Sequence, residues 1–220
     1  MIRQLPLFPL STILFPGTTI NLHIFEERYR QMIGRCLAEH APFGVVLIRQ
    51  GEEVEAGRLG TPPAEPYNIG TVAEISANVR LEDGRFLLTA VGRERFRIQS
   101  VLQRVPYLIA SVAELPEVIA PGAAAAADIL RATYRRYWQA VAAATGVPAQ
   151  PEELPDEPMT LAYQLADRLQ VPFARKQHWL ESSLMTRLRE MTADMCAELS
   201  LMPTGKRATG DGFAGMSGLN

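Results

Sequence analysis

A thiol and an imidazole stand at a spacing that could support nucleophilic chemistry. Cys36 and His40 are four residues apart in a segment with a helical pattern, so their side chains would share one face of the helix. Such a pair can act as nucleophile and base, or as two ligands of a metal ion. Zinc needs three or four ligands, and the other candidates, His23, His178 and Cys196, have no ligand-like spacing. We expect a buried thiol and no metal site, and keep a cysteine-centred hydrolase as the less favoured alternative.

Three arginines alternate along one predicted strand. In "VGRERFRI", Arg93, Arg95 and Arg97 fall on one side of the period-two pattern, with Phe96 and Ile98 on the other. Three guanidinium groups on one sheet face could bind carboxylates, phosphates or an acidic peptide. The same row is also compatible with a solvated outer face. It lacks the interleaved aromatic side chains on which RNA bases stack, which argues against nucleic acid.

The sequence contains no nucleotide-binding loop. A phosphate loop has a glycine five residues before a Gly-Lys pair, and Ser or Thr directly after the pair. The pair Gly205-Lys206 has Ser200 at the glycine position and Arg207 after it. Ser217 lacks the glycine that stands two residues before the serine of a nucleophile elbow. We therefore expect no cofactor and no serine catalysis.

Composition and charge restrict the class of protein. The chain has 220 residues, of which 47% are hydrophobic, enough for one large domain or two smaller ones with real cores. Its net charge of −2 gives no general attraction to nucleic acid or to an anionic membrane. No apolar run reaches the roughly 20 residues that a membrane helix needs, and prolines interrupt the first apolar segment before any signal-peptide pattern forms. We expect a cytoplasmic protein that does not bind membranes.

The first half of the chain has the pattern of a β-rich domain. Alternation of apolar and polar residues predicts strands at 43–48, 69–81, 86–98 and 106–115, and Asp83-Gly84 predicts a tight hairpin turn between the second and third of these. Pro16-Gly17 predicts a turn between two strands nearer the N-terminus. Apolar steps of three and four residues predict one helix over 26–39, inserted among the strands.

The second half of the chain has a helical pattern. Helices are predicted at 123–145, 158–170 and within 182–202, where Ser182 or Ser183 is the cap, and segments rich in proline or glycine precede them. The residues from 203 onward have the composition of a disordered tail. We therefore expect an α+β protein with a strand-rich domain at 1–118, a helical bundle at 119–202 and a disordered tail at 203–220.

Four sequence blocks resemble the N-terminal, substrate-recognition domain of Lon proteases. The first is "LPLFPLSTILFPGTTINLHIFEERYRQMI", which opens the chain; "IGTVAEI" at 69–75, "VGRERFRI" at 91–98 and "SLMTRLREM" at 183–191 follow in the expected order. The resemblance implies a PUA-like β pseudo-barrel with one inserted helix, followed by a C-terminal α-helical bundle. Full-length Lon continues with an ATPase module and a serine-lysine protease module, and neither fits in this sequence.

The resemblance implies a non-catalytic module that binds unfolded segments or partner proteins, with a separate protease or ATPase as a possible associate. Backbone pairing at a sheet edge would give affinity and pockets would give selectivity. PUA-like barrels elsewhere include RNA readers, so RNA binding stays as an alternative. The candidate peptide-binding residues are Phe15, Pro16, Gly17, Arg28, Tyr29, Arg93, Arg95 and Arg97.

Overall fold

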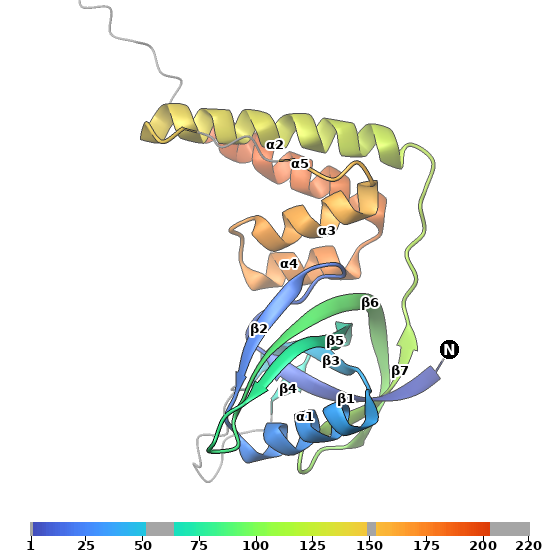
Figure 1. The fold of residues 1–220 in the computed structure, drawn as a ribbon. Helices are drawn as coiled ribbons and strands as arrows, with labels where there is room; N and C mark the ends of the chain where they lie inside the picture. The colour runs from blue at the N-terminus through green and yellow to red at the C-terminus, as the bar shows by residue number, and fades with distance from the viewer. Residues whose placement is uncertain (1, 52–63, 149–152, 203–220) are drawn as a thin grey trace, which may run out of the picture.

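A computed structural model describes residues 2–51, 64–148 and 153–202 (Figure 1). The tail predicted at 203–220 lies outside these ranges. The elements in chain order are β1 (Ile2–Leu10), β2 (Thr19–Ile24), α1 (Glu27–Glu39), β3 (Phe43–Gln50), β4 (Glu65–Pro66), β5 (Ile69–Arg80), β6 (Phe86–Gln103), β7 (Leu108–Glu114), α2 (Ala123–Thr145), α3 (Pro158–Arg168), α4 (Phe173–Glu181) and α5 (Leu184–Leu201). The predicted α+β fold is confirmed.

Five strands close into a ring. The order β1-β7-β6-β5-β3 is completed by a parallel pairing of β3 with β1, in which Phe8 lies opposite Val45. All five strands contribute to a small buried cluster inside the ring, which includes Leu7, Val72 and Phe96. Because apolar side chains from every strand fill this space, the ring is a packed pseudo-barrel rather than a channel.

The inserted helix covers one side of the strands. α1 buries Tyr29, Met32 and Ile33 against residues of β1, β2, β3, β5 and β6 in a second apolar cluster. Its spacing of three and four residues, read from the sequence, therefore corresponds to a real buried face. His40 ends the helix in the left-handed conformation, with φ of 50°.

The C-terminal helices stack on the strands from the opposite side to α1. Figure 1 shows α4 and α3 next to the strands, with the pair α2 and α5 farther away. The largest apolar cluster joins side chains of all four helices to Phe15, Leu47 and Ile69 from the strand-rich half. The predicted domain boundary at 118 falls in the linker between β7 and α2, but the two halves share this core.

Helix α4 was not expected from the sequence. It has only nine residues, follows Pro172 and has no side-chain cap at its N-terminus, so the local signals of a helix are weak. Trp179 and Leu180 hold it in place, because both are buried in the cluster shared with the strands. Among the described residues, no helix is both long and apolar enough to cross a membrane.

Candidate functional site

The Phe-Pro-Gly segment forms a type II turn that leads into β2. Thr18 N–H donates to the Phe15 carbonyl oxygen at 3.1 Å, and Gly17 has φ of 77°, which glycine adopts without strain. Pro16 occupies the second position, where its fixed φ suits the turn. Thr18 Oγ1 also donates to the Phe15 carbonyl oxygen at 3.0 Å and accepts from Phe15 N–H. The turn predicted at Pro16-Gly17 is therefore well defined.

Gly92 on β6 forms backbone hydrogen bonds with this turn. Gly17 N–H donates to the Gly92 carbonyl oxygen at 2.8 Å, and Gly92 N–H donates to the Thr18 carbonyl oxygen at 2.9 Å. Gly17 and Thr18 thus lie opposite the single residue Gly92. This arrangement is a β-bulge with Gly17 at its first position. A Cβ at position 92 would lie 3.0 Å from the Phe15 carbonyl carbon and closer still to its oxygen. Only glycine at position 92 lets the two backbone segments approach this closely.

A second bulge follows directly on β6. The two-residue step from Thr71 to Ala73 on β5 lies opposite the three-residue step from Gly92 to Arg95 on β6. On its other side, β6 pairs with β2 up to Val91 and with β7 from Phe96 onward. A gap therefore opens beside the bulge, between the start of β2 and the end of β7. Bulges often lie next to functional sites because they redirect side chains.

A cleft of about 410 Å³ occupies this gap, and α3 forms its far wall. Its size is within the range of small ligand pockets. The walls combine proline, leucine, methionine and tyrosine side chains with five charged ones. The lining residues are Pro16, Gly17, Arg93, Glu94, Arg95, Glu114, Leu115, Pro116, Glu117, Met159, Thr160 and Tyr163.

Four of the eight candidate residues line the cleft, namely Pro16, Gly17, Arg93 and Arg95. Phe15 lies behind the wall, fully buried, with its ring centroid 6.1 Å from that of Tyr163.

The arginine row is split by the second bulge. Arg93 is exposed and its Nε donates to Glu74 at 2.6 Å, whereas the Arg95 side chain is only 4% exposed. Arg97 is exposed and does not line the cleft. The three guanidinium groups therefore do not form one exposed row, because Arg95 is buried and the extra residue interrupts the alternation between Arg93 and Arg95.

Arg95 forms part of a buried polar network at the base of the cleft. Its guanidinium group lies 3.1 Å from Glu117 and donates to the carbonyl oxygens of Leu180 and Ser182 at 2.6 and 3.0 Å. Arg187 of α5 donates to the same Glu117 carboxylate at 2.8 Å. These contacts tie β6, the linker after β7, and the C-terminal helices to one carboxylate.

Tyr163 completes the network from α3. Its hydroxyl donates to Glu117, and the guanidinium carbon of Arg187 lies 4.3 Å from the centre of its ring. Burial raises the pKa of Tyr163, so the hydroxyl keeps its proton and stays a donor at neutral pH. Two arginines share one carboxylate, which leaves one excess positive charge buried beneath the cleft.

Arg28 and Tyr29 lie on α1, away from the cleft. The Arg28 guanidinium group stacks on the Tyr29 ring at 4.5 Å and binds Glu26 at 3.0 Å. The Tyr29 ring packs on Phe8, with centroids 4.2 Å apart, and is 5% exposed. Both residues support the helix rather than the cleft.

The Cys36 thiol is buried and difficult to ionise. Burial raises its pKa to about 11, with a further contribution from Glu39, and the thiol donates to the Pro42 carbonyl oxygen at 4.0 Å. A nucleophilic cysteine needs a lowered pKa, so the burial of Cys36 opposes a hydrolase centred on Cys36 and His40. Within the described ranges, no group of three or more His, Cys, Asp or Glu side chains could hold a metal ion.

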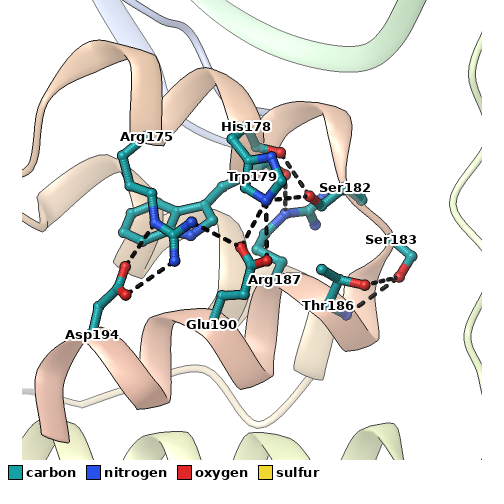
Figure 2. A network of polar contacts seen from close by, with 9 residues as sticks. All are labelled: Arg175, His178, Trp179, Ser182, Ser183, Thr186, Arg187, Glu190 and Asp194. Carbon is teal, nitrogen blue, oxygen red and sulfur yellow. Dashed lines mark hydrogen bonds and ion pairs between the residues drawn. The ribbon is translucent and has the colours of Figure 1, made fainter. Parts of the chain in front are cut away.

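A serine, a histidine and a glutamate also meet on the surface between α4 and α5 (Figure 2). His178 Nε2 lies 3.0 Å from Glu190 Oε1 and 3.4 Å from Ser182 Oγ. A catalytic relay needs the serine and the acid on different ring nitrogens, whereas here both contact Nε2. Arg175 adds two hydrogen bonds to Asp194 at 2.8 and 3.0 Å. The cluster therefore fastens α4 to α5 and does not form a triad.

Comparison with known proteins shows which family this arrangement belongs to. The family model of the substrate-binding domain of ATP-dependent protease La (Lon) matches residues 4–196. The chain belongs to the Lon substrate-binding domain family. The match covers the strand ring, the cleft and nearly all of the helical half.

Lon proteases are among the relatives of the chain. The chain is 26% identical to Lon protease 2 of Syntrophobacter fumaroxidans over 93% of its own length, and 28% identical to Lon protease of Desulforamulus reducens over 91%. It spans 26% and 25% of those two proteins. The similarity is thus to about one quarter of each relative.

Solved structures of Lon N-terminal domains share the fold. A Lon N-terminal domain protein from Xanthomonas campestris is 25% identical, with a TM-score of 0.59 over 91% of this chain and 99% of that one. The N-terminal domain of a Mycobacterium avium complex Lon protease has a TM-score of 0.60 at 19% identity, over 88% of this chain and 98% of that one, and supports the fold alone.

Several cleft residues were not candidates from the Lon-like sequence blocks. Met159 and Tyr163 come from α3, and Glu117 comes from the linker after β7. Tyr163 carries a weak signal, because it is a buried aromatic residue in an amphipathic helix, but that pattern fits any core position. The contacts of Tyr163 with Phe15 and Glu117 depend on how the C-terminal helices pack on the strands.

Proposed function

We propose that this chain is a non-catalytic polypeptide-binding module, which takes an unfolded or partner segment into the cleft between the strand ring and α3. Membership of the Lon substrate-binding domain family supports binding of polypeptide substrates. The observation that carries the assignment to this site is the cleft itself, where four of the eight candidate residues from the sequence line one cavity.

The chemistry of the cleft suits a polypeptide. Pro16, Leu115 and Met159 offer apolar surface for a hydrophobic side chain, and methionine adapts to different shapes. Charged groups such as Arg93 and Glu114 stand beside this surface and can contact the polar backbone or neighbouring side chains. A site that accepts many unfolded segments needs this combination of apolar contact and few fixed polar groups.

The cleft is poorly suited to RNA, the alternative considered from the sequence. Both cleft arginines already have carboxylate partners, since Arg93 binds Glu74 and Arg95 binds Glu117. Glu94 and Glu114 add negative charge to the lining. A polyanion would therefore meet carboxylates rather than free cations. Titration with a homopolymeric RNA should show no saturable, salt-dependent binding.

The binding test uses a permanently unfolded, fluorescently labelled polypeptide and fluorescence anisotropy. We expect saturable binding at micromolar concentrations. Met159→Glu places a charge in the apolar wall and should raise Kd about tenfold. Ala132→Glu, which adds the same charge on the exposed surface of α2, should leave Kd within about twofold. No binding by the unsubstituted chain, or equal Kd for both variants, would contradict the proposal.

Catalysis belongs, in this proposal, to a separate protease or ATPase that acts on the bound segment. The match to about one quarter of each Lon protease supports this view, because it lies in the substrate-binding domain. The purified chain, incubated with ATP, Mg²⁺ and the unfolded polypeptide, should release no phosphate and no fragments. ATP turnover that co-purifies with the chain through two chromatographic steps would count against it.

A further inference from the structure

Strand β2 has one edge that pairs with no strand among residues 2–51, 64–148 and 153–202. It pairs with β6 alone and lies outside the five-stranded ring. Figure 1 shows it alongside β6, at the margin of the sheet. Within the part of the chain that the structure describes, no backbone hydrogen bond outside the ladder with β6 involves Thr19–Ile24. The N–H and C=O groups on the other edge of β2 are therefore available to another chain.

The register identifies the residues that face outward. The hydrogen bond from Gly92 N–H to the Thr18 carbonyl oxygen fixes which positions bond to β6. In an antiparallel ladder, bonded positions alternate with positions that direct their backbone groups away. Ile20, Leu22 and Ile24 therefore bond to β6, and Thr19, Asn21 and His23 direct N–H and C=O to the open edge.

This edge lacks the features that usually prevent pairing. Exposed edge strands are commonly protected by charged residues, proline or a bulge. The segment Thr-Ile-Asn-Leu-His-Ile contains no charged residue and no proline, and its pairing with β6 is regular over six residues. The edge is therefore open to the addition of a further strand.

The side chains beside the edge indicate what kind of strand fits. Ile20 and Leu22 pack against the cluster under α1 but remain only partly buried. An added strand with apolar residues on the same face would cover them, as cross-strand pairs do within a sheet. The opposite face carries Thr19, Asn21 and His23, all exposed, so it imposes no apolar requirement.

We propose that the open edge of β2 binds an extended polypeptide segment of about six residues, apolar at alternate positions, as an additional β-strand. This inference rests on the proposed function and specifies its substrate class. β2 begins at Thr19, two residues after Gly17 of the cleft wall, so the edge and the cleft are continuous along the chain. Backbone pairing at the edge supplies affinity for any extended sequence, and the cleft selects among side chains.

The test removes the backbone N–H group of Asn21, which points to the open edge. Asn21→Pro removes the donor and places a ring at the open edge, where proline is tolerated without breaking the ladder with β6. Asn21→Ala is the matched control, because it keeps the N–H and also removes the Asn21 side chain that accepts from Thr89 Oγ1 at 2.7 Å. The probe is a labelled peptide of about ten residues with alternating valine and threonine.

We expect Asn21→Pro to raise the Kd of this peptide about tenfold, and Asn21→Ala to change it by less than about twofold. A peptide N-methylated at alternate residues should bind the unsubstituted chain about tenfold more weakly, a result that needs no variant to fold. Equal Kd for both variants and for the methylated peptide, with normal binding by the unsubstituted chain, would overturn the β2 assignment and leave the proposed function standing.

Two other outcomes separate the remaining possibilities. If the unsubstituted chain binds neither this peptide nor the longer unfolded polypeptide, the proposed function fails as well. If sedimentation shows a dimer that Asn21→Pro dissociates and the peptide does not, the edge pairs with a second copy of the chain, and the assignment to a substrate segment is overturned.

Discussion

The Phe15 carbonyl group occupies the space that a side chain at position 92 would need, since a Cβ on Gly92 would lie 3.0 Å from the Phe15 carbonyl carbon. This contact holds the turn that forms one wall of the cleft. The Phe15 side chain is fully buried between the strands and the helices.

Gly92→Ala should therefore lower the free energy of unfolding by about 2–4 kcal/mol, because backbone atoms rather than a flexible side chain must move. Urea unfolding measures the change. Gly34→Ala is the control: position 34 lies within α1 with nothing within 4 Å of its Cβ, so alanine should stabilise by about 0.5–1 kcal/mol. Similar effects at the two positions would refute the close-contact explanation.

Glu117→Gln should destabilise the protein by about 3–5 kcal/mol. The substitution leaves Arg95 and Arg187, both almost fully buried, without a compensating negative charge. Glu114→Gln in the same cleft is exposed and should change the free energy of unfolding by less than about 0.5 kcal/mol. Chemical unfolding curves of the two variants measure the difference. A small effect of Glu117→Gln would mean that the network around Glu117 does not hold the helices on the strands.

Cys36 should resist alkylation, while the exposed Cys196 reacts. Burial raises the pKa of Cys36 to about 11, so at pH 8 we expect labelling on the order of 100-fold slower than at Cys196. Mass spectrometry after a short iodoacetamide pulse locates the label. Cys36→Ala should leave the rapid labelling unchanged, because that labelling occurs at Cys196. Loss of the rapid labelling in this variant would show that the Cys36 thiol is accessible.

The raised pKa of Cys36 predicts that the protein loses stability at alkaline pH. The folded pKa lies above the unfolded value of about 8.5, so the folded state favours the protonated form. Its contribution is fully present below pH of about 8.5 and is lost as the pH rises toward about 11. Urea midpoints measured from pH 7 to 10 should fall less steeply in Cys36→Ala than in the unsubstituted chain. Parallel curves for the two proteins would contradict this assignment.

The shared core predicts one cooperative unfolding transition. Phe15, Leu47 and Ile69 pack among residues of the helices, and Arg95 bonds to two carbonyl groups at the C-terminal end of α4. A fragment ending at the predicted boundary, residues 1–118, would expose these groups and should not fold stably. Calorimetry of the whole chain should show a single peak. A folded fragment with its own sharp transition would instead support two independent domains.

Local patterns were sufficient to predict most elements. Alternation predicted the long strands, the Asp83-Gly84 and Pro16-Gly17 pairs predicted the turns, and three- and four-residue spacing predicted α1 and α2. Each of these signals depends on residues close together in sequence. The ring, the inserted helix and the helical bundle therefore followed from the sequence and its resemblance to the Lon domain.

The candidate site was only partly predictable, because its geometry depends on contacts between distant segments. The bulge at Arg93–Arg95 arises where β6 changes partners from β2 to β7, and no local pattern marks that change. As a result, Arg95 was expected on a charged face but lies buried under α4 and α5. Tyr163 and Glu117 likewise acquire their roles only when the helices pack on the strands.

The parallel pairing of β1 with β3 has a consequence for synthesis of the chain on the ribosome. β1 and β3 both lie within the first 50 residues and can meet early, but the other edge of β1 pairs only with β7, which ends at Glu114. At about 5–20 residues per second, β1 must wait roughly 5–20 s for that partner. For those seconds one edge of β1 in the nascent chain lacks the strand that covers it in the folded protein.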